Sequence, residues 1–534
     1  NIDMKIQNIK LITIARAFLL VFLFSSCANE LNIGPINPQI DLTFSKEDVF
    51  AKIYATLGHT GQEGPYGNGD VAGIDEGTSA FYRLIVTLNE FPSDEVLCSW
   101  NDVGIPEINF INWGSSHNMV EGLYGRLLFD VTICNHFLEQ TEGFSDSETV
   151  RQKAEVRFIR ALNYYYLMDL FGNPPFVQKV STDLPLQIER SNLFVFIENE
   201  LNDIEADLFE PTQAPFGRVD KAALWLLLSR LYLNAEVYTD IPKWGEALKY
   251  ADKVISSGYG LCSNYEYLFM ADNGENAETR KEMILPIRQD GIKIRTFGGA
   301  LFPIASTRAS GMVPWGTSEG WGGVRARKAL IDKFFPYNNA PVGTSKEEMM
   351  VAAKDRRALF YSGGYVNDEG NRDRDCTVKI TNVNNFKEGF SIVKWSNNRS
   401  DGKAAQDPQW VDTDIPFFRL AEAYLIYAEA AVRLGQNEDE ALRKVNLLRK
   451  RAGATELVTL TLDDILDEKC REFYFEGHRR TDLIRYGYFT SGTYLWDWKG
   501  GQSDGVAVDT NYNLFPIPVS DIINNPNLKQ NPGY

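Results

Sequence analysis

Apolar residues recur at helical spacing in the second quarter of the chain, between about residues 119 and 257. Ala154, Phe158 and Ala161, for example, share one face of a predicted helix that ends at the Gly-Asn-Pro-Pro sequence of residues 172–175. The helices predicted in this part of the chain are 119–140, 148–171, 192–208, 219–238 and 243–257.

The same periodicity returns between about residues 415 and 487. Leu420, Tyr424 and Ala428 lie on one face of a helix that is expected to end at Gly435, and residues 438–452 form its partner. One last long helix is predicted over residues 461–487. It begins at Thr461 and carries Asp463 and Asp464 in its first turn, where carboxylates favour the helix dipole.

Two segments, about 58–118 and 258–414, interrupt this pattern with Gly, Asn, Asp and aromatic residues and short strand-like runs at 283–287 and 390–395. We therefore predict an all-α fold: a scaffold of helix pairs of tetratricopeptide-repeat (TPR) size that carries two large loop-rich insertions, within one domain over residues 46–534. The chain shows no clean 34-residue consensus, so ordinary helix packing remains the alternative to a TPR-like scaffold. A helical scaffold with long loops is typical of a binding surface.

The N-terminal residues predict an exported lipoprotein. Residues 1–26 combine basic residues, an apolar run at 17–24 that is too short to span a bilayer, and two serines before Cys27. This pattern predicts a signal peptide, after which Cys27 becomes the acylated first residue and 27–45 form a tether. The alternative is an ordinary secretory signal followed by an incidental cysteine.

The charge of the chain restricts its partners. The formal net charge is −18, and residues 1–26 hold three basic groups and one acid, so the remainder carries about −20. Such a surface repels phosphate backbones, which argues against nucleic acid as a partner. It also argues against binding anionic lipid through the surface, so the acyl chain is the predicted anchor to the membrane.

Motifs for catalysis are missing from the sequence. There is no HExxH, P-loop, nucleophile-elbow or dinucleotide glycine motif, and the glycines of residues 67–73 are interpreted as a loop. The four histidines have unrelated spacings, and 72 acidic residues make any carboxylate pair uninformative. The five cysteines after Cys27 are scattered and are interpreted as single buried thiols.

The loop aromatics carry the strongest functional signal. Trp100, Trp315 and Trp321 lie in segments rich in Gly, Asn, Asp and Ser rather than on predicted helices. An exposed aromatic face stacks on the C–H face of a sugar ring, and nearby polar groups hydrogen-bond to its hydroxyls. The alternative is that each tryptophan plugs its loop onto the body of the protein.

An acidic turn near the centre of the chain is a candidate calcium site. Its oxygen-bearing side chains are Asp272, Asn273, Glu275, Asn276 and Glu278. Hard oxygen ligands at this spacing suit Ca²⁺, although the sequence is not an EF-hand. A solvated acidic loop is the alternative, and no other cofactor is expected.

The helical motifs resemble the RagB/SusD family of outer-membrane glycan-binding lipoproteins of Bacteroidetes. The segments that carry the resemblance are 154–176, 419–430, 471–487 and 515–534. The resemblance covers nearly the whole chain. It implies a TPR-like scaffold, a surface glycan site without catalytic activity, and a partner that is a SusC-type TonB-dependent outer-membrane transporter.

The charged residues in these motifs are interpreted as structural. We expect five of them to form salt bridges between helices, and His478 to be a packing residue. The five are Glu155, Arg157, Arg160, Glu472 and Arg479.

The loops resemble more narrowly those of a starch-binding member of that family. The matching segments are 75–83, 90–95, 393–403 and 495–501. In that relative an arc of aromatic rings follows the curve of an α-glucan helix. The resemblance implies stacking by Trp100, Trp321 and Phe297.

The same resemblance implies polar contacts from Asp75, Arg83 and Asn101. Two positions depart from the pattern. Phe297 stands where that relative has a tyrosine, so the stacking ring is kept but a hydroxyl is lost. Cys98 stands where it has a second tryptophan, so the aromatic surface expected for stacking is narrower.

Three functions follow, in order of preference. The first is non-catalytic capture at the cell surface of starch or maltooligosaccharides, which are handed to the transporter. The second is a related binder of a different glycan or of peptides, and the third is a surface glycoside hydrolase. The second gains if Trp100 and Trp321 prove buried or far apart, and the third requires two opposed carboxylates in a deep cleft.

Overall fold

The computed structural model of the protein describes residues 44–308, 312–364 and 376–534. The predicted signal peptide, Cys27 and nearly all of the predicted tether lie outside these residues. The elements below belong to the unit formed by Lys46–Tyr534.

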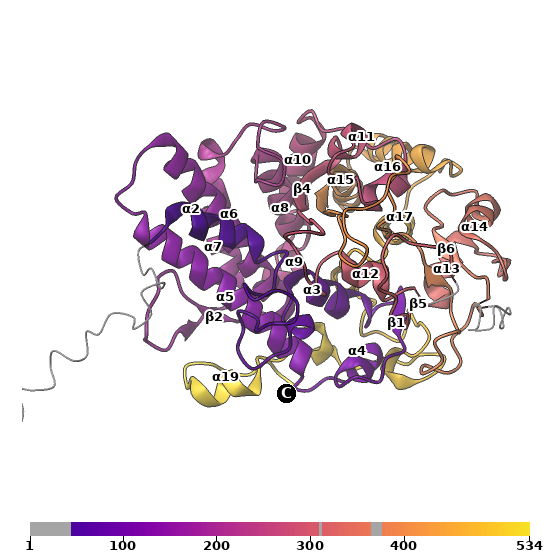
Figure 1. The fold of residues 1–534 in the computed structure, drawn as a ribbon, viewed down its shortest axis with the longest axis horizontal. Coiled ribbons are helices and arrows are strands. Elements are labelled where there is room, and N and C mark those ends of the chain that lie inside the picture. Colours follow the sequence, from indigo (N-terminus) through magenta and orange to yellow (C-terminus); the bar gives the residue numbers. More distant parts are fainter. Residues whose placement is uncertain (1–43, 309–311, 365–375) are drawn as a thin grey trace, which may run out of the picture. The chain divides into compact units, whose positions relative to one another are not determined.

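Helices dominate both halves of this unit (Figure 1). Those of the first half are α2 (Lys46–Ala55), α3 (Phe81–Glu90), α4 (Ile105–Phe110), α5 (Asn118–Gln140), α6 (Ser147–Phe171), α7 (Arg190–Ile204), α8 (Lys221–Leu233), α9 (Ala235–Thr239) and α10 (Trp244–Ile255). Those of the second half are α11 (Ala277–Arg280), α12 (Leu301–Ala305), α13 (Lys328–Phe334), α14 (Lys346–Ala353), α15 (Leu420–Leu434), α16 (Glu438–Ala452), α17 (Leu462–Phe473), α18 (Arg479–Arg485) and α19 (Val519–Asn524).

The described strands are short and form two-stranded antiparallel sheets. The pairs are β1 (Val96–Cys98) with β5 (Val324–Ala326), β2 (Pro175–Phe176) with β3 (Leu186–Gln187), β4 (Met283–Ile287) with β8 (Ile415–Arg419), and β6 (Phe360–Tyr361) with β7 (Ser391–Ile392). Of the run predicted at 390–395, only β7 is a strand.

Local sequence explains where the long helices begin and end. The Asp146 carboxylate caps α6 by accepting a hydrogen bond from the Thr149 amide at 2.9 Å, and the helix ends at Gly172, whose φ of 71° is left-handed. α15 likewise ends at Gly435 in the left-handed region. The helices predicted between 119 and 257 are confirmed to within a few residues, although the stretch 219–238 divides into α8 and α9.

The helices pack in pairs, which confirms the predicted all-α TPR-like scaffold. α6 contacts both α5 and α7, and α10 contacts both α8 and α15, so helices from the two halves of the chain lie side by side (Figure 1). Small residues make this approach possible, since Ala247 and Ala251 of α10 and Ala428 of α15 are all fully buried.

The last long helix was predicted wrongly. Residues 461–487 form two helices, α17 and α18, with a break at residues 474–478. Phe475 and Gly477 have positive φ values of 59° and 90°, which a helix cannot contain. The Glu90 carboxylate accepts hydrogen bonds from the Gly477 and His478 amides, and Glu95 accepts one from the Phe475 amide. Tertiary acceptors thus replace the helical hydrogen bonds.

The segment 58–118 also holds more helix than predicted. α3 has only ten residues and α4 only six, and a glycine-rich segment precedes α3, so each helical signal is short. α3 carries Arg83 near its start and Glu90 at its end. It therefore connects the region around Arg83 with the break between α17 and α18.

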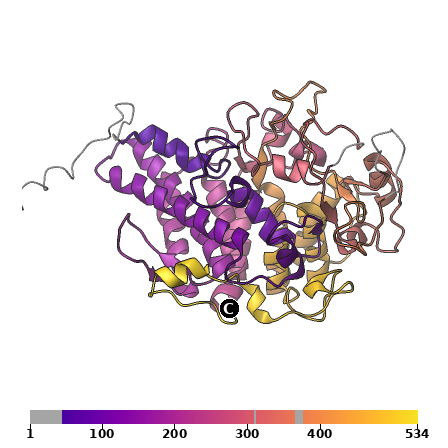
Figure 2. The same ribbon diagram turned by 60° about the horizontal axis from the view of Figure 1, so that its bottom comes forward.

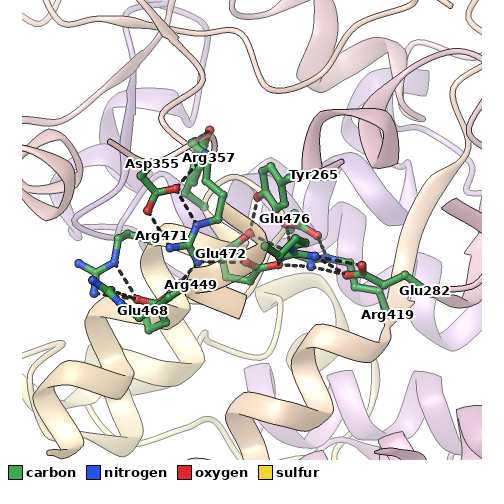
Figure 3. A network of polar contacts seen from close by, with 12 residues as sticks. Tyr265, Glu282, Asp355, Arg357, Arg419, Arg449, Glu468, Arg471, Glu472 and Glu476 are labelled. Atoms are coloured by element: carbon green, nitrogen blue, oxygen red, sulfur yellow. Dashed lines mark hydrogen bonds and ion pairs between the residues drawn. The ribbon is translucent and has the colours of Figure 1, made fainter. Parts of the chain in front are cut away.

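A buried network of arginines and carboxylates joins the helices of the second half (Figure 3). Glu472 of α17 pairs with Arg357 at 3.1 Å and with Arg419 and Arg451, while Glu468 pairs with Arg357 at 2.7 Å. The predicted ion pairing of the five charged residues is confirmed, because the remaining four are also ion-paired. These pairs are Glu155 with Arg218, Arg157 and Arg160 with Glu200, and Arg479 with Asp94. The partners of Glu155 and Arg479, however, lie in loops rather than on helices. His478 is half-buried and packs on Phe473, with 4.9 Å between the ring centroids.

The C-terminal segment runs along the helices of the first half (yellow in Figure 2). The Phe515 amide donates to the Leu170 carbonyl at 2.8 Å, and the Asn531 side chain donates to the Phe171 carbonyl at 2.9 Å. All five cysteines after Cys27 are buried, as predicted. Among the described residues, no helix combines the length and the apolar character needed to cross a bilayer.

Candidate functional site

A cavity of about 1040 Å³ lies among loops that are far apart in the sequence. Its wall is formed by the loop of residues 65–78, by Arg83 at the start of α3, by Trp100 with residues 102–105, and by Phe297 and Trp321. Five of the six predicted binding residues line it: Asp75, Arg83, Trp100, Phe297 and Trp321.

The aromatic rings of the cavity form a row of tilted neighbours. The centroid of Trp100 lies 6.3 Å from that of Trp321, with 59° between the ring planes, and Trp321 lies 6.1 Å from Phe297 at 55°. Tyr66 continues the row, 5.4 Å from Phe297 at 75°. We call Tyr66, Phe297, Trp321 and Trp100 the ring row. Successive planes differ by more than 50°, so the row offers no flat platform for a straight, ribbon-like polysaccharide.

Trp100 and Trp321 are held together by the pairing of β1 with β5. Trp100 follows β1, and its indole nitrogen donates to the Gly322 carbonyl at 2.9 Å. A Cβ atom at Gly323 would lie 2.2 Å from that indole nitrogen, so this position, with φ of 95°, has to be glycine. Residues separated by more than 200 positions thus share one corner of the cavity.

Glu76 fixes Phe297 beside the loop that follows Tyr66. Glu76 is buried, and its carboxylate accepts hydrogen bonds from the hydroxyls of Thr60 at 2.7 Å and Thr296 at 2.5 Å. The same oxygen accepts from the Phe297 amide at 3.3 Å. A single buried carboxylate therefore joins two walls of the cavity.

Arg83 lies beneath the rings. Its guanidinium carbon is 4.9 Å from the Phe302 ring centroid, 5.9 Å from that of Trp100 and 6.0 Å from that of Trp321. Burial lowers its pKa, while the neighbouring carboxylates of Glu76 and Asp75 act in the opposite direction. Gly77 makes room for it, because a Cβ atom there would lie 2.3 Å from a guanidinium nitrogen.

Three positions singled out in the sequence lie elsewhere. Asn101 is exposed but is not part of the cavity wall, which Asp102 and Val103 form instead. Cys98 is buried in β1, burial raises its pKa to about 12, and it does not line the cavity. The indole nitrogen of Trp315 donates to the Glu319 carbonyl within its own loop, so this tryptophan is the loop plug of the alternative interpretation.

Sequence reasoning missed Tyr66. It is an aromatic residue between proline and glycine, the same loop context as that of the loop tryptophans, so a tyrosine in such a loop is the signal that could have identified it. It also missed Glu319 and Gln409. Their carboxylate and amide hydrogen-bond to Trp321 and Tyr66, a connection that sequence spacing does not reveal.

The side chains of the predicted calcium site have other partners. Asp272 accepts from the Ser400 amide and hydroxyl at 2.7 and 2.6 Å, Glu275 pairs with Arg399, and Glu278 pairs with Lys281. Asn273 bridges to the Asp414 backbone, and Asn276 caps α11.

The side-chain oxygens of this turn are engaged with protein partners, so a calcium ion would have to displace those partners to be coordinated here. No group of three His, Cys, Asp or Glu side chains within the described residues is arranged to hold a metal ion. Calcium binding here stays a prediction, which the melting temperature with and without added Ca²⁺ tests.

The chain is 49% identical to the starch-binding protein SusD of Bacteroides thetaiotaomicron over 538 aligned positions, which cover 96% of each protein. The SusD family model also matches residues 301–534. The chain belongs to the SusD family. Members of this family are carbohydrate-binding proteins and not enzymes.

Solved structures agree with this fold. A SusD-like protein from Bacteroides fragilis matches with a TM-score of 0.69 at 20% identity, covering 94% of this chain and 100% of the other. Surface glycan-binding protein A from B. thetaiotaomicron, solved with laminarihexaose, matches with a TM-score of 0.66 at 20% identity over 91% and 98% of the two chains. The scaffold of the SusD family is thus present over nearly the whole chain.

Proposed function

We propose that this SusD family protein is a cell-surface lipoprotein that binds starch and maltooligosaccharides without cleaving them. The observation that carries the proposal is the ring row. Trp100, Phe297 and Trp321 come from three separate loops and line one cavity, and their ring planes turn by 55–59° from one ring to the next. A curved glucan fits such a row, because each sugar ring stacks on a differently tilted face.

The polar groups of the cavity fit the same ligand. Asp75 is exposed at the start of the turn η1 (Glu76–Thr78), and Arg83 lies against Trp100 and Trp321. An acceptor and a donor beside stacked rings match the vicinal hydroxyls of a sugar. Asn101 contributes, in this proposal, only if its exposed loop turns toward the cavity when the glycan binds.

The test is calorimetric titration of the purified protein with maltoheptaose, run beside cellohexaose. Heat with the α-glucan alone supports the proposal, because cellohexaose is a straight β-linked chain of similar size. Heat with neither glucan overturns starch as the ligand and moves the function to a different glycan or to peptides. Release of reducing sugar would instead identify a hydrolase.

The proposal includes delivery to a SusC-type TonB-dependent transporter in the outer membrane. It rests on membership of the SusD family and on the lipoprotein pattern that ends at Cys27. Tagged protein extracted in mild detergent should copurify with such a transporter. The absence of any β-barrel partner from the purified material would contradict it.

Anchoring through Cys27 is proposed on the same pattern. The wild-type protein should incorporate labelled palmitate and fractionate with the outer membrane. The Cys27→Ser variant should lose both the label and the association with the outer membrane. Protease added to whole cells should degrade the wild-type protein, because we propose that it faces the cell exterior. Membrane retention of the serine variant would show that the cysteine is incidental.

A further inference from the structure

Tyr66 stands at the open end of the ring row, and its side chain is 78% exposed. It is one of the most exposed aromatic side chains among the described residues, and yet it lines the cavity. An exposed aromatic face beside other cavity rings is available to stack on a sugar ring. The following inference rests on the proposed function.

Two neighbouring rings and one hydrogen bond hold Tyr66 in place. Its ring meets that of Phe297 edge-on, with 5.4 Å between the centroids. The ring of the buried Trp410 lies 6.2 Å from that of Tyr66, and the planes of these two rings are 73° apart. Its hydroxyl oxygen accepts a hydrogen bond from the Gln409 side-chain amide at 3.2 Å. The polar end of the ring therefore has a partner, and much of the ring remains free.

Gln409 links Tyr66 to the centre of the row. The Gln409 amide also donates to one Glu319 carboxylate oxygen at 2.9 Å, and the other oxygen accepts from the Trp321 indole nitrogen at 2.7 Å. A continuous chain of hydrogen bonds thus connects Tyr66 with Trp321. Phe297 lies between them in the ring row, in contact with both.

The loop that carries Tyr66 is braced from below by Arg126 of α5. The buried Arg126 guanidinium donates to the Thr60 carbonyl at 2.6 Å and to the Asp70 carboxylate at 3.0 Å. The Asp70 amide donates to the Thr60 carbonyl at 2.7 Å, which closes the loop at its base. A loop fixed before binding loses little conformational freedom when a ligand arrives.

We propose that Tyr66 forms an additional subsite for one further glucose unit of an α-glucan, and that Glu319 and Gln409 are positioning residues that align this subsite with Trp321. The stacking face is preformed, lies at the edge of the cavity and continues the tilt of the row. The subsite therefore serves chains that are long enough to extend beyond Phe297.

The experiment compares Tyr66→Ala with wild-type protein by calorimetry over a series from maltotriose to maltoheptaose. We expect a loss of about five- to tenfold in affinity for maltoheptaose, the size typical of one lost aromatic contact, and less than twofold for maltotriose. Tyr66→Phe should keep most of the affinity. Tyr337→Ala is the matched control, because Tyr337 is 85% exposed and lies outside the cavity.

Gln409→Ala tests the positioning role. It should reproduce part of the loss for maltoheptaose while the affinity for maltotriose stays within twofold, because Trp321 keeps its bond to Glu319. An equal loss for short and long chains would overturn the subsite, since it would place the effect at the central rings. Unchanged affinity of Tyr66→Ala for maltoheptaose would also overturn it while leaving the proposed function intact. Failure of the wild-type protein to bind any maltooligosaccharide would overturn the proposed function itself.

Discussion

At the scale of single residues, the same residue type serves two different purposes within one loop. Trp321 lines the cavity and hydrogen-bonds to the Glu319 carboxylate, whereas Trp315 hydrogen-bonds to the Glu319 backbone and fills its own loop. Only six positions separate the two. This difference allows the stacking role of Trp321 to be separated from the structural role of its loop.

Trp321→Ala should therefore abolish detectable binding of maltoheptaose without unfolding the protein. Loss of a central stacking ring removes about 1–3 kcal/mol of binding free energy. Trp315→Ala should lower the melting temperature and keep the affinity. Calorimetry and thermal unfolding of both variants provide the check, and a reversed pattern would show that Trp321 is structural.

Asp130 of α5 is a buried carboxyl whose charge opposes folding. One of its carboxylate oxygens lies 3.9 Å from a guanidinium nitrogen of Arg126, the residue that braces the Tyr66 loop. Burial raises the pKa of Asp130 to about 7. Because the pKa in the folded state exceeds the ordinary value of about 3.9, the proton stabilises the folded protein at low pH. That contribution is complete below about pH 4 and is lost as the pH rises through 7.

Asp130→Asn should accordingly stabilise the protein at high pH. We expect the free energy of unfolding to rise by about 2–4 kcal/mol at pH 8 and by less than about 2 kcal/mol at pH 5, because asparagine is neutral at both. Urea unfolding at the two pH values measures the difference. An equal gain in unfolding free energy at pH 5 and pH 8 would show that the Asp130 carboxyl does not titrate between these two pH values.

At the scale of elements, α3 and the break between α17 and α18 depend on each other. Glu90 at the end of α3 accepts hydrogen bonds from the Gly477 and His478 amides, and Gly477 has φ of 90°. A Cβ atom at Gly477 would lie 3.1 Å from the Ile85 side chain of α3. The break is thus fixed by both backbone conformation and contact with α3.

Gly477→Ala should destabilise the protein more than Gly487→Ala. Both glycines have positive φ, which costs alanine about 1–2 kcal/mol, but nothing lies within 4 Å of a Cβ atom at Gly487. The additional loss of unfolding free energy in Gly477→Ala, relative to Gly487→Ala, measures the crowding of the new methyl group against α3. Denaturant unfolding of the two variants gives both values, and equal losses would show that Ile85 moves aside freely.

At the scale of the whole molecule, buried ion pairs join described segments that are far apart in the sequence. Burial by itself raises the pKa of Asp94, Glu429 and Glu468, but the positive groups beside them, among them Arg479, Arg485 and Arg357, lower each pKa to about 2. Each carboxyl therefore binds its proton less tightly in the folded protein than in the unfolded chain.

Acid should unfold the protein cooperatively through these groups. The stabilisation from depressed carboxyl pKa values is complete above about pH 4.5 and is lost as the pH falls toward 2. The urea midpoint should thus decline steeply between pH 4.5 and 3. A midpoint that stays constant down to pH 3 would show that the network adds nothing to stability.

The sequence by itself determined the elements whose signals are local. Caps, glycine stops and helical periodicity located α5, α6, α15 and α16, because these features act within one or two turns of the chain. Side-chain type and loop context also singled out Trp100 and Trp321, whereas Phe297 and the assignment of the three rings to one site came from family resemblance.

Only the tertiary structure decided where distant groups meet. The break at Gly477 exists because Glu90, almost 400 residues earlier, offers acceptors to its backbone, and no local pattern encodes that partner. Tyr66 joins the ring row for the same reason, since Phe297 and Gln409 reach it from more than 200 residues away. Local sequence sets the conformation of a segment, whereas a binding surface depends on packing between segments, which forms only when the chain has folded.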